Sequence, residues 1–325
     1  MKVLVTGGTG FLGSHVVRRL ARDDHTVTVF RRASSSTSAL DDVNVRDEVG
    51  DLGDAPSVHR AVDGQDVVIH AAASAPAGGA RPDSYEVNVA STRTVVQACI
   101  AAGVNRLVHV SSVAAIGVPD DRTPADEDFV FNLGGSRLYY HISKRKAEDV
   151  VREGVARGLD CVIVNPGSLW GPFRGEYRDS NILRRVRHAR RVRVSPGGIC
   201  IAHVDDVATG IAAAMLRGSP GTRYILGGDN LTYREWITMI ASVLDVRPRL
   251  VPVPGIALEL LAKTLGYMAG VRPRFHGPYL RAYFAGRYAF YDSSKAAKEL
   301  EYAARPFDAI LRECASSLPP EAAAA

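Results

Sequence analysis

The sequence predicts an α/β protein with a Rossmann-like, doubly wound parallel sheet and a smaller C-terminal lobe. The first half alternates short apolar runs with helical patterns, which indicates right-handed crossovers between parallel strands. The apolar runs are continuous, as in strands that helices cover on both faces. A glycine-rich turn joins the first run to the first helical pattern.

The expected elements follow one another in order. Residues 11–22 carry apolar Leu12, Val16 and Leu20 at helical spacing, while 106–111 (RLVHVS) and 161–165 (CVIVN) are rich in strand-forming residues. We predict strands at 2–6, 26–30, 66–70, 106–111 and 161–165, and helices at 11–22, 87–102 and 139–157.

Composition narrows the class of protein. The 325 residues are 46% hydrophobic and 23% charged, with a net charge of +5, which is typical of a globular chain and does not call for a nucleic-acid partner. The four cysteines show no CxxC or Cys/His cluster, so we expect no metal site and a reducing, cytoplasmic setting. The apolar run at the N-terminus is too short for a secretory signal.

The turn after the first strand has the pattern GxxGxxG. Gly7 permits the sharp turn, Gly10 lets the backbone approach a pyrophosphate, and Gly13 lets the helix pack on the strand. The helix that opens at Phe11 and Leu12 offers its N–H groups to phosphates. We predict a dinucleotide site here; the alternative is a tight strand–helix turn without a ligand.

The alternation fades after Pro166. We therefore assign residues 1–166 to an NAD(P)-binding domain and 167–325 mainly to a substrate-binding lobe, with a segment at about 200–228 returning to the sheet through 223–226 (RYIL). We expect 167–183 and 248–325 to be helical or irregular. Residues 255–270, interrupted by Glu259 and Lys263, predict an amphipathic helix and no integral membrane segment.

The end of the second strand indicates which cofactor is preferred. Dinucleotide folds usually place an acid there for the ribose 2′-hydroxyl, whereas this chain has Arg31 and Arg32. Arginine pairs with a 2′-phosphate through its planar fork. We expect NADP(H) to be preferred and NAD(H) to be possible; the alternative is a pair of solvated arginines.

Two further segments are candidates for cofactor contacts. Asp51, next to Leu52 after a third strand, is placed to accept the adenine amino group or to cap a turn. The small residues Ala71, Ala72 and Ala73 follow strand 66–70, where they let the backbone lie against the cofactor or pack a tight strand end.

Tyr140 and Lys144 are four residues apart and share one helix face. An ammonium beside a phenol lowers the tyrosine pKa, which suits Tyr140 to exchange a proton with a carbonyl oxygen. Strand 106–111 ends at Ser111 and Ser112, on the edge where parallel sheets bind ligands. We favour Ser112 to hydrogen-bond the reacting oxygen, with Ser111 as the near alternative. The competing interpretations are a solvated helix face and a strand-capping hydroxyl.

Together these motifs resemble the extended short-chain dehydrogenase/reductases of the NAD-dependent epimerase/dehydratase family, and within it the dihydroflavonol-4-reductase-like subgroup. The segments that carry the resemblance are TGGTGFLG (6–13), GDL (50–52), HAAA (70–73), VSS (110–112), YHISK (140–144), NPGSLWGP (165–172), HVDDVA (203–208), RYILGGDNLTYREW (223–236) and GRYAFYDSSKAAKELEY (286–302).

The resemblance implies a catalytic triad of Ser112, Tyr140 and Lys144, with Lys144 also binding the nicotinamide ribose. It implies that Pro166, Gly167 and Ser168 lie near the nicotinamide. It also implies that Asn88 supports the active-site helix, that Asp205 and Asp206 are structural, and that a homodimer forms through 87–102 and 139–157. For Asn88, a helix-start hydrogen bond is the alternative.

The chain departs from family members that act on nucleotide sugars. Those enzymes often carry an asparagine where this chain has Ser168, and an arginine near the apolar segment 199–202 (ICIA). A diphosphate calls for charged partners. We therefore expect an NADP(H)-dependent oxidoreductase that reduces a ketone or aldehyde of a relatively apolar small molecule, or oxidises the alcohol. The alternatives are a nucleotide-sugar epimerase/dehydratase and a cofactor-sensing binding protein.

Residues 183–194 (LRRVRHARRVRV) hold six arginines. We expect a helix with a mainly solvated face; the alternatives are a site for an anionic substrate tail and contact with an acidic membrane surface.

Overall fold

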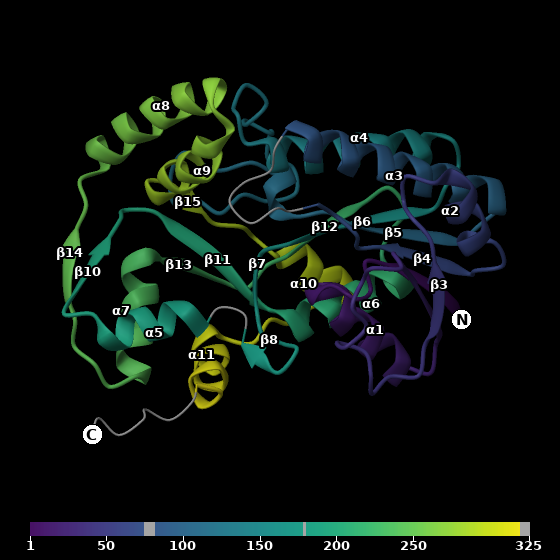
Figure 1. Cartoon of the computed structure of the whole chain (residues 1–325), viewed down its shortest axis with the longest axis horizontal. Coiled ribbons are helices and arrows are strands. Elements are labelled where there is room, and N and C mark those ends of the chain that lie inside the picture. Colours follow the sequence, from purple (N-terminus) through teal and green to yellow (C-terminus); the bar gives the residue numbers. More distant parts are fainter. Residues whose placement is uncertain (75–81, 178–179, 319–325) are drawn as a thin grey trace.

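The computed structural model describes residues 1–74, 82–177 and 180–318. Its centre is a sheet of seven parallel strands in the order β12-β6-β5-β4-β1-β2-β3, which confirms the predicted doubly wound fold (Figure 1). The strands are β1 (Lys2–Thr6), β2 (Thr26–Arg31), β3 (Arg46–Val49), β4 (Val67–His70), β5 (Arg106–Val110), β6 (Cys161–Pro166) and β12 (Arg223–Leu226).

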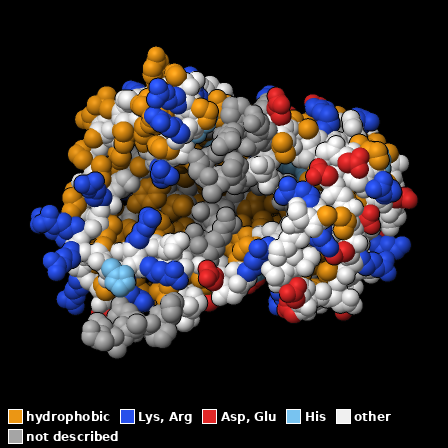
Figure 2. Space-filling view, in the orientation of Figure 1, with side chains coloured by type: hydrophobic (Ala, Val, Ile, Leu, Met, Phe, Trp, Pro, Cys, Tyr) orange, Lys and Arg blue, Asp and Glu red, His pale blue; other side chains and the backbone are white. Residues whose placement is uncertain are grey.

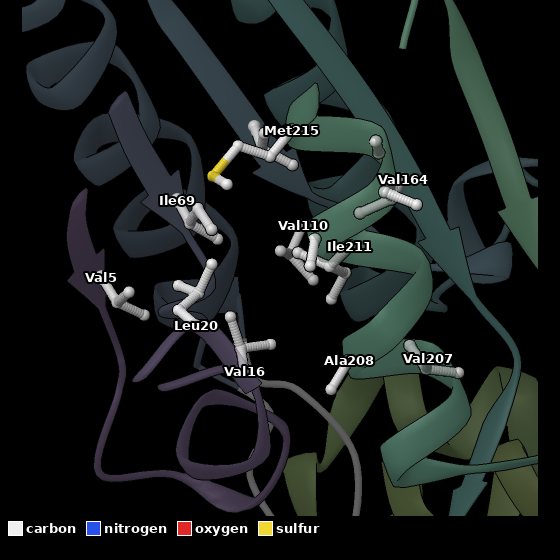
Figure 3. Packing of buried hydrophobic residues seen from close by; sticks show 14 of the residues in the cluster. Val5, Val16, Leu20, Ile69, Val110, Val164, Val207, Ala208, Ile211 and Met215 are labelled. Atoms are coloured by element: carbon white, nitrogen blue, oxygen red, sulfur yellow. The ribbon is translucent and has the colours of Figure 1, made fainter. Parts of the chain in front are cut away.

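Helices cover both faces of this sheet. One layer contains α1 (Phe11–Arg22), α6 (Val204–Arg217) and α10 (Ser294–Leu300), and the other contains α2 (Ala55–Val62), α3 (Pro82–Ala102) and α4 (Tyr139–Ala156). Neighbouring strand residues alternate between the layers: Val3 and Val5 pack in the first, and Leu4 in the second. Figure 3 shows side chains of α1 and α6 converging on Val5, Ile69 and Val110. Strands buried on both faces therefore read as continuous apolar runs.

The register aligns the carboxyl ends of the central strands. Thr6 pairs with His70, His70 with His109, and Val110 with Val164. The segments that follow β1, β4, β5 and β6 therefore begin at one edge of the sheet, where open parallel sheets bind ligands.

The second half of the chain adds a smaller lobe beside this edge (Figure 1). It contains a sheet in which β11 pairs with β13, β15 and β7, a β10–β14 pair and a β8–β9 pair. Its strands are β7 (Ser168–Trp170), β8 (Pro172–Phe173), β9 (Glu176–Tyr177), β10 (Arg191–Val194), β11 (Gly198–His203), β13 (Asp229–Thr232), β14 (Arg249–Pro252) and β15 (Tyr288–Ala289). Its helices are α5 (Ser180–His188), α7 (Tyr233–Val243), α8 (Gly255–Val271), α9 (His276–Ala285) and α11 (Phe307–Ser316), with short 3-10 turns η1 (Val113–Ala115) and η2 (Pro273–Phe275).

Two expectations for this half are wrong. Residues 167–183 and 248–325 contain strands β7, β8, β9, β14 and β15. Strands β7 and β15 pair with β11 and strand β14 pairs with β10, all distant in the sequence, whereas β8 and β9 pair with each other. The arginine-rich segment is a helix only to His188, and residues 191–194 form strand β10. The alternation of exposed Arg191 and Arg193 with Val192 and Val194 is a strand pattern that the charge count concealed.

The predicted helix at 255–270 is present as α8, but several of its large apolar side chains point outward. Only Ala262, Gly266 and Ala269 are buried, whereas Ile256 and Tyr267 are about three-quarters exposed, at 77% and 75%. Within the described residues, no helix has both the length and the apolar character needed to cross a bilayer.

Candidate active site

The glycine turn after β1 is shaped by contacts within the protein at two of its three glycines. Gly7 has a φ of +71°, and a Cβ there would lie 2.7 Å from the Cα of Ala72. A Cβ at Gly13 would overlap the carbonyl oxygen of Gly7. These two positions therefore require glycine for the fold itself.

Gly10 is different, because a Cβ there would meet only the Gly7 oxygen, at 3.2 Å. Gly10 precedes α1, whose first turn has neither a side-chain cap nor an acidic residue. This helix start has no acidic group nearby, and the protein's own packing does not require glycine at position 10. Both features fit an anionic group such as a pyrophosphate. The residues of this turn thus fit the predicted dinucleotide, including the helix start at Phe11 and Leu12.

The strand end after β4 lies directly beside this turn. The backbone N–H of Ala71 donates to the Thr6 carbonyl at 3.2 Å, and that of Ala72 donates to Thr6 Oγ1 at 3.3 Å. Ala71 and Ala72 are half-buried, and Ala73 is exposed. The structure therefore brings two of the predicted cofactor segments together.

The two arginines after β2 have different surroundings. Arg31 is paired with Asp47 of β3, with Nη2 2.7 Å from the carboxylate, while Arg32 is exposed. Asp51 caps a turn, since its Oδ1 accepts the Gly53 N–H at 2.7 Å, and Leu52 is half-buried against the α2–α3 layer. The end of β2 thus leaves Arg32 as the arginine whose side chain faces solvent.

The two serines after β5 have separate partners. Ser111 is buried, and its hydroxyl donates to Glu148 Oε1 at 2.7 Å. The hydroxyl oxygen of Ser112 accepts the Ala114 N–H at 3.2 Å, and Ser112 lines the cavity described below together with Tyr140. This arrangement favours Ser112 over Ser111 as the group that meets a substrate.

Tyr140 lies near the start of α4 and lines the same cavity as Ser112. Burial raises its pKa above 10, and a hydrogen bond with the Ser112 side chain acts in the opposite direction. Lys144 Nζ donates to the Val110 carbonyl at 3.0 Å, and burial is the dominant influence on the pKa of Tyr140. Tyr140 is therefore a neutral phenol in this structure.

Lys144 is almost fully buried one turn beyond Tyr140. Burial lowers its pKa to about 8, and the nearby Glu148 carboxylate partly offsets that effect. An ammonium with such a pKa loses its proton close to neutral pH, unlike an exposed lysine.

Two buried polar side chains hold the active-site helix in place. Asn88 of α3 donates from Nδ2 to Ser143 Oγ at 3.0 Å, and Ser143 donates to the Tyr140 carbonyl at 2.8 Å. Asn88 also bonds the backbone of Ser74, so it links α4 to the segment after β4. This link matches the support expected from the family resemblance.

Glu148 is a second support, and the sequence analysis did not identify it. Its fully buried carboxylate accepts hydrogen bonds from Ser111, Arg152 and Arg223, and from Asn165 Nδ2 at 2.7 Å. Asn165 Nδ2 also donates to the Ser112 carbonyl at 2.9 Å. Glu148 follows Lys144 by four residues on the same helix, and this spacing was the available signal.

A cavity of about 280 Å³ opens where the two lobes meet. Ser112, Tyr140, Gly167 and Ser168 line it from the sheet edge, and beside them Pro166 is buried at the end of β6. The small lobe contributes Ile199, Cys200, Tyr233, Phe284 and Tyr291 among others. No Lys, Arg, Asp or Glu is among the described residues that line the cavity.

Few polar groups of this cavity remain available to a ligand. The hydroxyls of Tyr233 and Tyr291 donate to the backbone carbonyls of Phe284 and Gly117. His141 stacks on Phe284 with ring centroids 5.1 Å apart, and burial lowers its pKa to about 4, so it is uncharged. Ser112, Tyr140, Ser168 and the uncharged His141, whose buried Nδ1 has no hydrogen-bond partner among the described residues, are thus the polar groups of an otherwise apolar and aromatic cavity.

Residues 3–227 match the model of the NAD dependent epimerase/dehydratase family. The chain belongs to this family. It is 33% identical to sterol demethylase protein B of Methylococcus capsulatus over 92% of this chain and 93% of that protein. It is 32% identical to a Synechocystis protein provisionally named dihydroflavonol 4-reductase, over 91% and 88% of the two chains. The crystal structure of gox2253 superimposes with a TM-score of 0.83 at 32% identity, covering 97% of each chain.

Membership of the family confirms the predicted resemblance, and the structure shows where the predicted departures lie. Ser168 and the apolar pair Ile199 and Cys200 both line the cavity. The family aspartates lie outside it: Asp205 bonds His15 Nδ1 at 2.5 Å, and Asp206 pairs with Arg305 at 2.7 Å. The aromatic wall of Tyr233, Phe284 and Tyr291 had no sequence signal, because two segments about fifty residues apart assemble it.

Proposed function

We propose that this protein is an NADP(H)-dependent oxidoreductase that reduces the ketone or aldehyde of a relatively apolar small molecule, or oxidises the corresponding alcohol. The observation that carries the proposal is the cavity. It holds the Ser112 and Tyr140 hydroxyls among apolar and aromatic side chains and, in the described residues, no charged group. Apolar cavities with a few convergent polar groups suit small molecules whose one polar atom is to be oriented.

The roles follow from these positions. The bound nicotinamide supplies or accepts the hydride at the carbonyl carbon. Tyr140, kept neutral by burial, gives its proton to the carbonyl oxygen, and Ser112 hydrogen-bonds the same oxygen as negative charge develops. Lys144 provides a buried positive charge one helical turn after Tyr140. Pro166, Gly167 and Ser168 would hold the nicotinamide when it is bound, as the family resemblance implies.

Related proteins support an apolar substrate rather than a nucleotide sugar. The names of the two relatives refer to a sterol and to a dihydroflavonol. A nucleotide diphosphate needs charged, bidentate partners. The described cavity lining offers none, which is the reason for placing the epimerase/dehydratase alternative second.

The deciding experiment follows NADPH oxidation with a panel of apolar ketones and aldehydes. We expect turnover with wild type, and at least about a hundredfold loss in Tyr140→Phe with cofactor affinity unchanged, because general acid catalysis supplies about that much. Tyr139→Phe on the neighbouring residue is the matched control. Purified protein that retains nicotinamide and epimerises a sugar nucleotide without net NADPH consumption would contradict the proposal.

We attribute the proposed NADP(H) preference mainly to Arg32. Arg31 already has a carboxylate partner in Asp47, whereas Arg32 is exposed and the strand end lacks an acid. Arg32→Ala should weaken NADPH binding about tenfold and leave NADH binding unchanged, since a charged hydrogen-bond pair contributes about 1.5–3 kcal/mol. Fluorescence titration with both cofactors measures this; equal losses for the two cofactors would assign Arg32 another role. Arg31→Asp should shift the preference further towards NADH.

The assignment of residues 1–166 and 167–325 to two functional parts, a cytoplasmic location and a homodimer through α3 and α4 are also proposals. The four cysteines are buried and lie far from one another in the sequence, which is in keeping with a reducing compartment. Sedimentation velocity tests the dimer, and Arg93 with its exposed partner Glu153 marks the face to mutate.

A further inference from the structure

Helix α8 carries an apolar stripe that the proposed reaction does not use. Ile256, Leu260, Tyr267 and Val271 are 77%, 61%, 75% and 69% exposed. Their spacing of i, i+4, i+11 and i+15 places them on one face of the helix. Exposed apolar residues scattered singly are ordinary, but a row along a whole helix marks an interaction surface.

The inner face of α8 has the opposite character. Its buried residues are Ala262, Gly266 and Ala269, which pack against α9 and the aromatic cluster of Tyr279. A Cβ at Gly266 would come within 3.1 Å of the Tyr279 ring. The helix thus buries small residues, with Leu265 partly buried against the same cluster, and exposes the four large residues of the stripe. Folding alone favours a helix with its apolar stripe towards the core.

Exposed arginines lie on the elements directly before and after α8, and on α5 and β10 of the same lobe. The arginine edge, as we call it, consists of exposed residues without an ion pair among the described residues: Arg184, Arg185, Arg190, Arg191, Arg193, Arg247, Arg249, Arg272 and Arg274. Arg191 of β10 pairs in register with Arg249 of β14, so two guanidinium groups belong to adjacent strand positions. Strand β14 leads directly into α8, and Arg272 follows its last residue.

Figure 2 shows orange side chains over α8 at the upper left and blue side chains along the left edge, over β10, β14 and α5. We propose that α8 and the arginine edge form a docking surface for an anionic lipid bilayer. A surface helix binds a bilayer by burying an apolar stripe at the headgroup boundary, and arginines beside it are attracted to anionic headgroups. The apolar stripe and the excess positive charge are the two features that this binding needs.

A second copy of the chain fits the surface less well. A symmetric contact across α8 would bring the two arginine edges near each other, because both partners use the same patch. Like charges then oppose association. An anionic lipid surface, by contrast, carries the negative charge that the arginine edge attracts.

Docking in this orientation brings the catalytic cavity close to the lipid. Helix α9, which packs on the inner face of α8, contributes Phe284 to the cavity wall. Only the packed pair α8 and α9 would therefore separate an apolar molecule in the bilayer from the cavity. The docking proposal stands on the surface alone and holds whichever reaction the cavity performs.

The test is flotation of the full-length protein with vesicles of phosphatidylcholine, with and without about one-third phosphatidylglycerol. We expect binding to the anionic vesicles only, lost at high salt. Leu260→Ser with Tyr267→Ser should lower the partition coefficient about tenfold, through lost apolar burial. Arg191→Gln with Arg249→Gln should lower it about twenty-fivefold, since each arginine near such a surface contributes about fivefold.

Matched controls lie on the other lobe. Leu216→Ser removes an apolar side chain that is 57% exposed on α6, and Arg60→Gln with Arg157→Gln removes two exposed charges. These variants should bind like wild type, and circular dichroism melting should show that all variants are folded. Failure of wild type to float with anionic vesicles overturns the proposal. So does a concentration-dependent dimer, abolished by Leu260→Ser with Tyr267→Ser, in protein that binds no vesicles.

Discussion

At the residue scale, the three glycines of the GxxGxxG turn have different roles: two are required by the fold, and one is left for a ligand. Gly7 and Gly13 are required by backbone contacts within the protein, whereas a Cβ at Gly10 is nearly accommodated. Sequence alone treats the three glycines alike, because the motif records only their spacing. The structure divides them by what each Cβ would meet.

Gly10→Ala should therefore mainly weaken dinucleotide binding, and Gly13→Ala should mainly lower the free energy of unfolding. Gly10→Ala should change the free energy of unfolding by less than about 1 kcal/mol but weaken dinucleotide binding tenfold or more, since the methyl group occupies the approach to the phosphates. Gly13→Ala should destabilise the fold by about 1–3 kcal/mol or more, because it collides with the Gly7 carbonyl. Urea unfolding and cofactor titration measure both. Equal effects of the two changes would contradict this division.

Lys144 predicts a pH dependence. Its pKa is lowered to about 8, so the ammonium predominates below pH 8 and is lost as the pH rises through that value. If the ammonium is the active form, kcat/KM for the cofactor, which reports groups of the free protein, should fall above about pH 8.

The Glu148 carboxylate raises the lysine pKa, so Glu148→Gln should move this limb of the profile to lower pH. Glu153→Gln, an exposed change on the same helix, should leave it in place. If kcat/KM does not change from pH 7 to about pH 10, the charge of Lys144 has no role in the reaction.

At the element scale, burial rather than residue type decides what each helix contributes. Helix α6 presents Ile211 to the central sheet with no exposed surface, and Figure 3 shows it opposite Val110. Helix α8 presents Ile256 to solvent at 77% exposure. Both helices are rich in apolar residues, and only the packing shows which of them holds the fold together.

The matched pair Ile211→Ala and Ile256→Ala tests this contrast. Ile211→Ala should lower the free energy of unfolding by about 2–5 kcal/mol through lost burial and a cavity. Ile256→Ala should stay within about 0.5 kcal/mol, as exposed substitutions do. Both values come from denaturant unfolding. A similar cost for the two changes would mean that α8 is also buried in solution, for example by self-association.

At the scale of the whole molecule, the site exists only where two lobes meet. The sheet edge supplies Ser112, Tyr140 and Ser168, and the smaller lobe supplies the aromatic wall. Dinucleotide bound to the sheet edge stabilises the folded chain by mass action. NADPH at about a hundred times its dissociation constant should raise the free energy of unfolding by about 2.7 kcal/mol.

Thermal melts with NADPH and NADH at equal concentration check this prediction, with Arg32→Ala as the matched variant. The larger increase in Tm should belong to NADPH in wild type, and the difference should shrink in Arg32→Ala. No increase with either cofactor would show that the glycine turn holds no dinucleotide.

The sequence by itself determined the Rossmann-like sheet, the glycine turn and the Tyr140–Lys144 pair. Each of these is encoded locally, by strand and helix periodicity or by a motif within a few residues. The tertiary structure alone decided which serine faces the cavity, how Glu148 links two strand ends, which apolar residues form the wall, and that α8 points several of its large side chains outward. These features depend on contacts between residues up to about two hundred positions apart, so no short stretch of sequence contains them.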